Sequence, residues 1–139
     1  MAKELRYETL VDVVADGVAA ADAGAEFRND SSGMIMIREL DLIATIRTAG
    51  VNEQVSVEIS KAPVRQGAVA NGPFFLFQVE IGMPSTGATP VDGSITGTKV
   101  KRWERGQLTL EPGESLFMNI TKAQTGGAAT GTATISYEF

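Results

Sequence analysis

Two side chains that enzymes and metalloproteins use most are absent, because none of the 139 residues is cysteine or histidine. Without cysteine the chain has no disulfide, no thiolate ligand for zinc and no thiol nucleophile. Without histidine it lacks the commonest general base, the commonest metal ligand and the middle member of a Ser-His-Asp triad. Catalysis is left with carboxylates, lysines and hydroxyls, so we expect no enzymatic activity, no metal site and no cofactor.

Positive charge is also scarce. The chain has 12 Lys and Arg against 17 Asp and Glu, which gives a formal net charge of −5. Such a surface repels phosphate on average, so nucleic acid is not expected as a main partner. No apolar run approaches the roughly 20 residues that span a bilayer, and the charged N-terminus does not fit a secretory signal peptide. We therefore expect no membrane partner and no export.

Aromatic residues make up only 6% of the chain, whereas 15 residues are glycine. This balance suits many turns between thin strands better than a few thick helices. A hydrophobic fraction of 43% with 21% charged residues is near the globular average, which indicates a folded chain. A chain of this length is expected to form one domain.

Alternation of polar and apolar residues predicts strands from residue 27 onward. In the segment 34–48, apolar residues keep one phase up to Ile37 and the opposite phase from Leu40. A slip by one residue at Arg38 and Glu39 is what a β-bulge produces, although a helix is the rival interpretation of this segment. Further strands are expected at 55–60, 75–81, 94–102, 106–110, 115–121 and 130–139.

Residues 1–26 have two interpretations. The apolar residues between Leu10 and Val18 fit one face of a helix, but the β-branched run 9–14 fits a strand. We favour an N-terminal arm or first strand for 1–26, followed by a single β-sandwich domain at 27–139. Several short strands with regular turn signals are typical of an all-β sandwich or barrel.

Two clusters of oxygen-bearing side chains are candidate sites. Glu111 and Glu114 flank a Pro-Gly turn and could hold calcium with a third carboxylate or act as the two acids of a glycosidase. A solvated hairpin tip is the interpretation we prefer, because no Asp-x-Asp-x-Asp loop supplies further ligands. Asn29, Asp30 and Ser32 could surround a cation, but an Asx-type turn ahead of a strand is again preferred.

Four residues are candidates for an interface. Trp103, the single tryptophan, is suited to stack on a sugar ring or a neighbouring subunit, or to lie at the core edge under arginine stems. Met34, Met36 and Phe74 fall on the phase opposite to the expected core. This places apolar side chains on an outer face, as at protein contacts.

Several stretches together look like a single jelly roll. They are FRNDSSGMIMIRELDLIATI at 27–46, FFLFQVEI at 74–81, GQLTLEPGESLFMNI at 106–120 and the closing TATISYEF. They resemble in particular the small structural proteins of double-stranded DNA viruses: capsid, cement, decoration and turret or fibre subunits. The resemblance covers 27–139 and lies in the pattern of strands and turns. Cupins, another jelly-roll family, need metal-binding histidines that are absent here.

This resemblance implies a jelly-roll-like antiparallel sandwich of about eight strands with an extended N-terminal arm. It implies a non-enzymatic structural protein of the virion, made in the host cytoplasm. The implied partners are further copies of the chain, in a trimer or a pentamer or other ring, and neighbouring virion proteins. The alternative function is a carbohydrate-binding or adhesion module that uses Trp103 and the loop 83–93 to bind a glycan.

Overall fold

The computed structural model describes residues 5–14, 20–47, 53–62, 74–83, 94–122 and 128–139. In these ranges the chain forms nine strands and no helix, and therefore no helix that could span a membrane. The strands are β1 (Leu5–Val14), β2 (Ala20–Arg28), β3 (Ile35–Arg47), β4 (Glu53–Ala62), β5 (Phe74–Met83), β6 (Ser94–Arg102), β7 (Thr109–Leu110), β8 (Ser115–Lys122) and β9 (Ala128–Glu138). The all-β prediction is confirmed, and the helical interpretation of the segment beginning at residue 34 is wrong.

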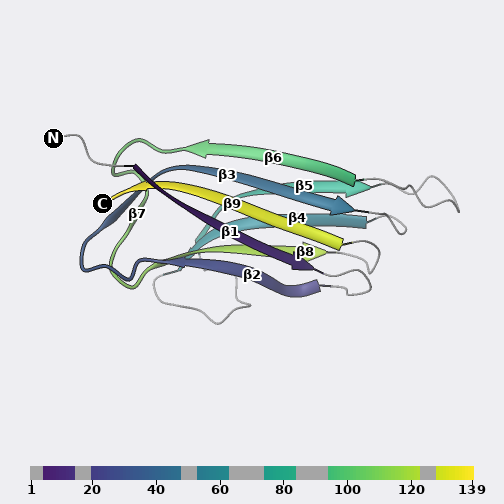
Figure 1. Cartoon of the computed structure of the whole chain (residues 1–139), viewed down its shortest axis with the longest axis horizontal. Coiled ribbons are helices and arrows are strands. Elements are labelled where there is room, and N and C mark those ends of the chain that lie inside the picture. Colours follow the sequence, from purple (N-terminus) through teal and green to yellow (C-terminus); the bar gives the residue numbers. More distant parts are fainter. Residues whose placement is uncertain (1–4, 15–19, 48–52, 63–73, 84–93, 123–127) are drawn as a thin grey trace, which may run out of the picture.

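The strands form two antiparallel sheets, seen one behind the other in Figure 1. Sheet A has the order β1-β9-β3-β6, with the two-residue β7 paired to the start of β3. Sheet B has the order β2-β8-β4-β5. When β7 is set aside, the first strand pairs with the last and the second with the last but one. The remaining pairs, β3 with β6 and β4 with β5, complete a long hairpin wound around one core. This topology is a jelly roll, and the predicted fold class is confirmed.

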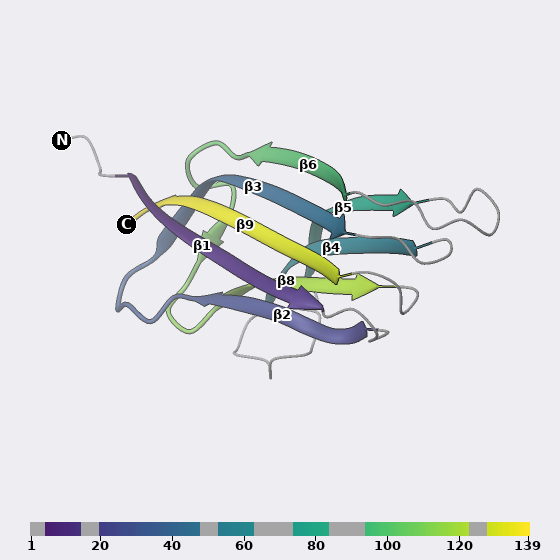
Figure 2. The same cartoon turned by 45° about the vertical axis from the view of Figure 1, so that its right-hand side comes forward.

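The first two strands are part of the sandwich. β1 pairs with β9 along its whole length, from Leu5 opposite Glu138 to Val14 opposite Ala129. β2 pairs with β8 at the edge of the other sheet, and β1 and β2 contact each other where the two sheets meet (Figure 2). Much of the segment 1–26 that was expected as an arm or first strand therefore lies in these two strands.

The core lies between the sheets and is mainly aliphatic. β3 contributes its inward residues in two phases, because its register with β9 shifts between Ile37 and Glu39. Ile37 lies before this shift and Leu40 after it, and both are fully buried. The predicted β-bulge at Arg38 is thus confirmed. Other large side chains that are fully buried include Leu42, Ile46, Val55, Val57, Ile59, Leu110, Leu116, Met118, Ile120 and Ile135.

Small residues on the inner side of sheet A let the sheets approach closely. Ala44 on β3 pairs with Gly131 on β9 on one side and with Gly97 on β6 on the other. A Cβ atom on Gly131 would lie 2.9 Å from Cδ1 of Ile120, and a Cβ atom on Gly97 would overlap the side chain of Ile81. Branched side chains of sheet B therefore occupy the space that larger residues in this row would need.

Candidate functional site

The outer face of sheet A consists of the side chains of β1, β9, β3 and β6 that point away from the core. Successive residues of a strand point to opposite faces, so the neighbours of buried Leu10, Leu42 and Ala133 point outward. The pairing aligns these outward residues in rows across the four strands. Three of the rows are Thr9, Thr134, Asp41 and Val100; Val11, Thr132, Ile43 and Thr98; and Val13, Thr130, Thr45 and Thr96.

Exposed apolar side chains are concentrated on this face. Of the eight large hydrophobic residues that are exposed in the described part of the chain, six lie here. Tyr7 is 65% exposed, Val11 55% and Val100 51%, and the others are Leu5, Val13 and Ile43. Contiguous exposed apolar patches usually mark contact surfaces. The threonines between them add methyl groups, and the hydroxyls of Thr45 and Thr96 lie within hydrogen-bond distance of each other at 3.3 Å.

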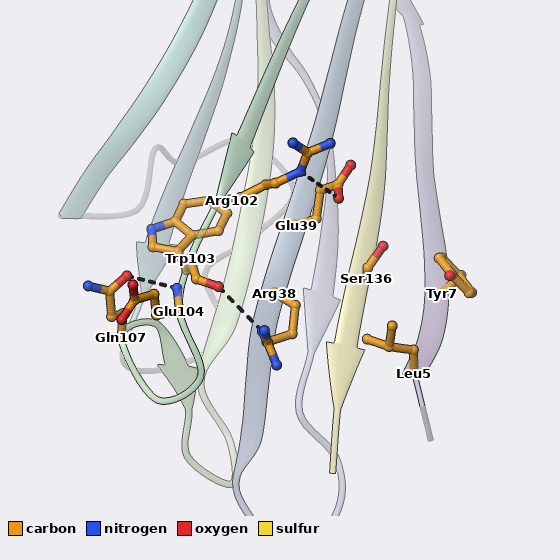
Figure 3. Close-up of a pocket in the computed structure, with 9 residues that line it drawn as sticks. All are labelled: Leu5, Tyr7, Arg38, Glu39, Arg102, Trp103, Glu104, Gln107 and Ser136. Atoms are coloured by element: carbon orange, nitrogen blue, oxygen red, sulfur yellow. Dashed lines mark hydrogen bonds and ion pairs between the residues drawn. The ribbon is translucent and has the colours of Figure 1, made fainter. Parts of the chain in front are cut away.

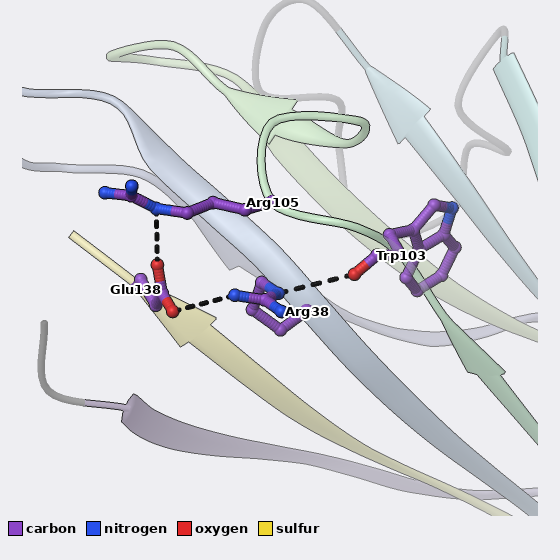
Figure 4. A network of polar contacts seen from close by, with 4 residues as sticks. All are labelled: Arg38, Trp103, Arg105 and Glu138. Carbon is purple, nitrogen blue, oxygen red and sulfur yellow. Dashed lines mark hydrogen bonds and ion pairs between the residues drawn. The ribbon is translucent and has the colours of Figure 1, made fainter. Parts of the chain in front are cut away.

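Most charged residues of the face lie toward one end and form ion pairs with each other. Arg38 Nη1 and Arg105 Nε donate to the two carboxylate oxygens of Glu138 at 2.9 and 3.1 Å (Figure 4). Arg102 Nε donates to Glu39 at 3.1 Å. Asp41 lies in a middle row, and Arg47 ends β3 in the same outward phase. With these two residues the face has four arginines and three acidic residues, so its formal net charge of +1 is close to zero.

An open depression of about 630 Å³ lies at this charged end (Figure 3). Its lining comes from β1, β9, β3, the end of β6 and the loop that follows β6. The lining residues are Leu5, Tyr7, Arg38, Glu39, Arg102, Trp103, Glu104, Gln107 and Ser136. Two arginines and two glutamates balance, and Gln107 Oε1 accepts a hydrogen bond from the Glu104 amide at 2.8 Å. The depression thus suits a neutral group better than an ion.

The outer face of sheet B differs in character. Its outward phase carries Glu26, Glu58 and Glu80, which alternate with core residues along their strands. The arginine in this phase, Arg28, is paired with Asp30 at 3.3 Å. Acidic residues thus outnumber this arginine among the described outward residues, and Phe117 and Asn119 in the middle rows of the face are buried. Among the side chains that the structure describes, no large apolar one is exposed on this face.

The predicted interface methionines lie at the start of β3 and have different environments. Met34 precedes the strand and is 41% exposed. Met36 points outward as expected but is only 7% exposed, so the prediction of an exposed Met36 is wrong. In the ladder it lies between Thr109 and Glu138, and Arg105 binds Glu138 (Figure 4). These neighbours are far from Met36 in the chain and leave no signal in the local alternation.

The other two predicted interface residues do not join the methionines in one patch. Phe74 begins β5 in sheet B, and its side chain lies outside the described residues. Trp103 is partly buried against the core, with its ring edge-to-face to Phe77 at a centroid distance of 6.1 Å. Lys101 Nζ lies 5.7 Å from the centre of the indole. Trp103 therefore lies at the core edge, one of the three environments that its sequence context left open, and the cation over its ring is Lys101 instead of an arginine.

The Glu-Pro-Gly-Glu stretch forms the predicted turn. The Glu114 amide donates to the Glu111 carbonyl at 2.9 Å, and Gly113 has a φ of +91° that favours glycine. The Glu114 carboxylate accepts a hydrogen bond from the Glu111 amide at 2.7 Å and pairs with Lys61 at 3.4 Å. Its oxygens thus stabilise the turn. In the described residues no group of three or more acidic side chains could hold a metal ion.

Asn29 forms the predicted Asx-type turn and is fully buried. Its Oδ1 accepts from the amide and hydroxyl of Ser31 at 3.0 and 2.7 Å. Its Nδ2 donates to the carbonyls of Gly33 and Leu110, both at 2.8 Å. The backbone amide of Gly113 donates to the Asn29 carbonyl at 2.8 Å. This side chain therefore joins the loop before β3 to the turn before β8 and serves the fold.

Sequence reasoning missed most of the outer face of sheet A. One signal was available in β9, where Thr130, Thr132 and Thr134 alternate with small or apolar residues. A second was available in β1, where Val11 and Val13 are apolar in the phase opposite to Leu10. Neither signal identifies the outward phase until the pairing is known.

Comparisons with known proteins leave the chain without a family. No family model and no curated protein matches it. Among solved structures it is similar to dimeric latent PorU from Porphyromonas gingivalis, with 9% identity and a TM-score of 0.44 over 95% of this chain and 13% of that chain. It is also similar to a Broad Bean Stain Virus chain, with 8% identity and a TM-score of 0.44 over 94% of this chain and 84% of that chain. For Eiger TNF from S. frugiperda the identity is 8% and the TM-score 0.37, over 94% of this chain and 92% of that chain. At such TM-scores these similarities carry no inference about function.

Proposed function

We propose that this protein is a non-enzymatic structural subunit of a virus particle that acts by self-association and by contact with neighbouring virion proteins. The observation that carries the proposal is the concentration of six exposed large hydrophobic residues on one face whose formal charge is close to zero. The viral setting comes from the resemblance of 27–139 to structural proteins of double-stranded DNA viruses. A jelly roll hosts many functions, so the fold alone would not support this choice.

The free energies of burial and association favour a weak contact between two subunits that becomes stable when many copies assemble. Burying a half-exposed valine or isoleucine contributes about 1 kcal/mol. Two copies that bury such a face against each other bury twelve such side chains, which contribute about 12 kcal/mol. This lies within the range of the cost of losing translational and rotational freedom, about 4–15 kcal/mol. An isolated pair of subunits is then marginal, whereas a closed assembly sums many contacts. This is the behaviour expected of a shell or surface component.

Light scattering on the wild-type protein over a wide concentration range tests self-association. We expect the average mass to rise with concentration, and electron microscopy to show closed particles or rings. A protein that stays monomeric at its highest attainable concentration would contradict the proposal. Mass spectrometry of purified particles of the virus that encodes the chain tests its location, and its absence from them would contradict the viral setting.

A carbohydrate-binding or adhesion module is the second candidate. The observation that favours it is the depression beside Tyr7, whose exposed ring is free to stack on a sugar while nearby polar groups offer hydrogen bonds. Trp103 is less suitable because it packs against the core, and residues 84–93 of the other expected ligand-binding segment lie outside the described residues. A glycan array should show binding that Tyr7→Ala abolishes. No binding by the wild type would exclude this candidate.

A further inference from the structure

The edges of sheet A carry charges in the phase that points toward the core. On β6, Lys99 and Lys101 lie opposite Leu42 and Leu40, which are fully buried. Both lysines are nevertheless exposed, because β6 is the last strand of the sheet. A strand that paired with this edge would bury or displace these ammonium groups. Inward-pointing charges of this kind are a known protection of sheet edges against pairing with another chain.

The opposite edge of sheet A has the same feature. On β1, Arg6 and Glu8 lie opposite the buried residues Tyr137 and Ile135, yet both charged side chains are exposed. Asp12 follows in the same phase. Both edges of sheet A are therefore poorly suited to extend the sheet into a second copy. Self-association through sheet A must then use its face.

The charge distribution selects a second copy of the same face as the partner. Two copies of an acidic chain with a formal net charge of −5 repel each other least where each surface is neutral. Pairing the outer faces of sheet B would bring glutamates such as Glu58 and Glu80 against those of the other copy. Pairing the outer face of sheet A with that of sheet B would place Val11 and Ile43 against glutamates and remove those glutamates from water. Pairing two outer faces of sheet A avoids both costs.

The dimensions of the face are adequate. Four strands at about 4.8 Å spacing and about ten residues at 3.3 Å give a footprint of about 600 Å² per copy. Standard interfaces bury about 800 Å² of accessible surface per partner, and the pleated face exceeds its flat footprint. β-branched side chains such as Val11, Ile43 and Thr132 are also those that fill the roughly 10 Å between stacked sheets.

We propose that two copies of this chain associate through the outer faces of sheet A, with Thr132 and Ile43 near the middle of the contact. The edges of sheet A stay unpaired. This inference rests on the proposed function, because it names the surface by which the subunit self-associates. An isologous contact of this kind pairs the same surface on both copies and gives dimers as the first assembly step.

Single-cysteine variants of the full-length chain test the inference directly, since the wild type contains no cysteine. Thr132→Cys labels the outer face of sheet A, Lys99→Cys its β6 edge, and Thr121→Cys the outer face of sheet B. Each position is at the surface, and far-UV circular dichroism verifies folding. A short bis-maleimide is added at a concentration where light scattering shows dimers. We expect Thr132→Cys to cross-link about tenfold faster than the other two, because contact raises its effective concentration.

Each outcome decides between the inference and the proposed function. Faster cross-linking of Lys99→Cys or Thr121→Cys in a dimerising protein would overturn the face-to-face contact and leave self-association intact. Ile43→Cys, in the same row as Thr132, covers the case in which Thr132→Cys itself weakens the dimer. If neither Thr132→Cys nor Ile43→Cys cross-links faster than the two controls, the contact lies elsewhere. A wild-type chain that is monomeric throughout overturns both proposals.

Discussion

Compare the outer faces of the two sheets, which enclose the same core. On sheet A, Val11, Ile43 and Thr132 lie in a row of uncharged β-branched residues, and the charges at the end of the face pair with each other. On sheet B, the outward phase carries Glu26 and Glu58 and exposes no large hydrophobic side chain of known exposure in the described residues. On sheet B the outward Phe117 and Asn119 are buried, whereas on sheet A the outward Val11 and Ile43 are exposed. This difference indicates which side meets a partner.

The largest effect is expected from breaking the core that both faces share. Gly131→Val places a branched side chain where a single Cβ atom would already lie 2.9 Å from Ile120. We expect a loss of about 3 kcal/mol in the free energy of unfolding, measured by urea denaturation. Gly33→Val is the control, because a Cβ atom on Gly33 has no neighbour within 4 Å. Equal losses in both variants would contradict the close approach of the sheets.

Substituting a glutamate should destabilise the protein more on sheet A than on sheet B, although by less than Gly131→Val does. Glu138 is buried and bound by Arg38 and Arg105, whereas Glu80 on sheet B is exposed. Glu138→Gln weakens two charge-assisted hydrogen bonds and should cost about 2 kcal/mol in unfolding free energy. Glu80→Gln should change it by less than about 0.5 kcal/mol. If Glu138→Gln were as stable as the wild type, the cluster would not organise this end of sheet A.

Self-association should respond to a charge on one face only. Val11→Lys adds a cation to the outer face of sheet A, and Thr121→Lys adds the same cation to sheet B. We expect the first to raise the dissociation constant at least tenfold, or about 1.4 kcal/mol, because the cation must be desolvated in the contact. Light scattering or sedimentation measures both variants. A stronger effect of Thr121→Lys would reverse the assignment of the two faces.

The smallest expected effect is that of salt on the wild-type protein. The outer face of sheet A is nearly neutral but the whole chain is acidic, so salt screens the repulsion between copies more than any attraction. Raising the salt concentration should strengthen self-association by about two- to threefold. Sedimentation equilibrium at low and high salt measures this change. Dissociation at high salt would instead indicate a contact made by opposite charges.

Local features of the fold were predictable because each depends on neighbouring residues. The β-bulge follows from the change of phase at Arg38, and the turn from Pro112 and Gly113. The Asx-type turn follows from Asn29 with its small polar neighbours. Met36 faces outward as predicted, but its burial could not be predicted because its ladder neighbours Thr109 and Glu138 are far from it in the chain. Such long-range contacts leave no trace in local alternation.

The sequence by itself determined that this protein is an all-β sandwich, through turn residues and alternation, and that chemistry by cysteine or histidine is excluded. Only the tertiary structure decided which side of each strand faces water. In β1, Leu10 and Val11 are both apolar, and pairing with β9 buries the first and exposes the second. The physical reason is that a strand has two faces of equal intrinsic preference when both are apolar. Packing against sheet B decides which of the two faces is buried, and the other face becomes part of the outer face of sheet A.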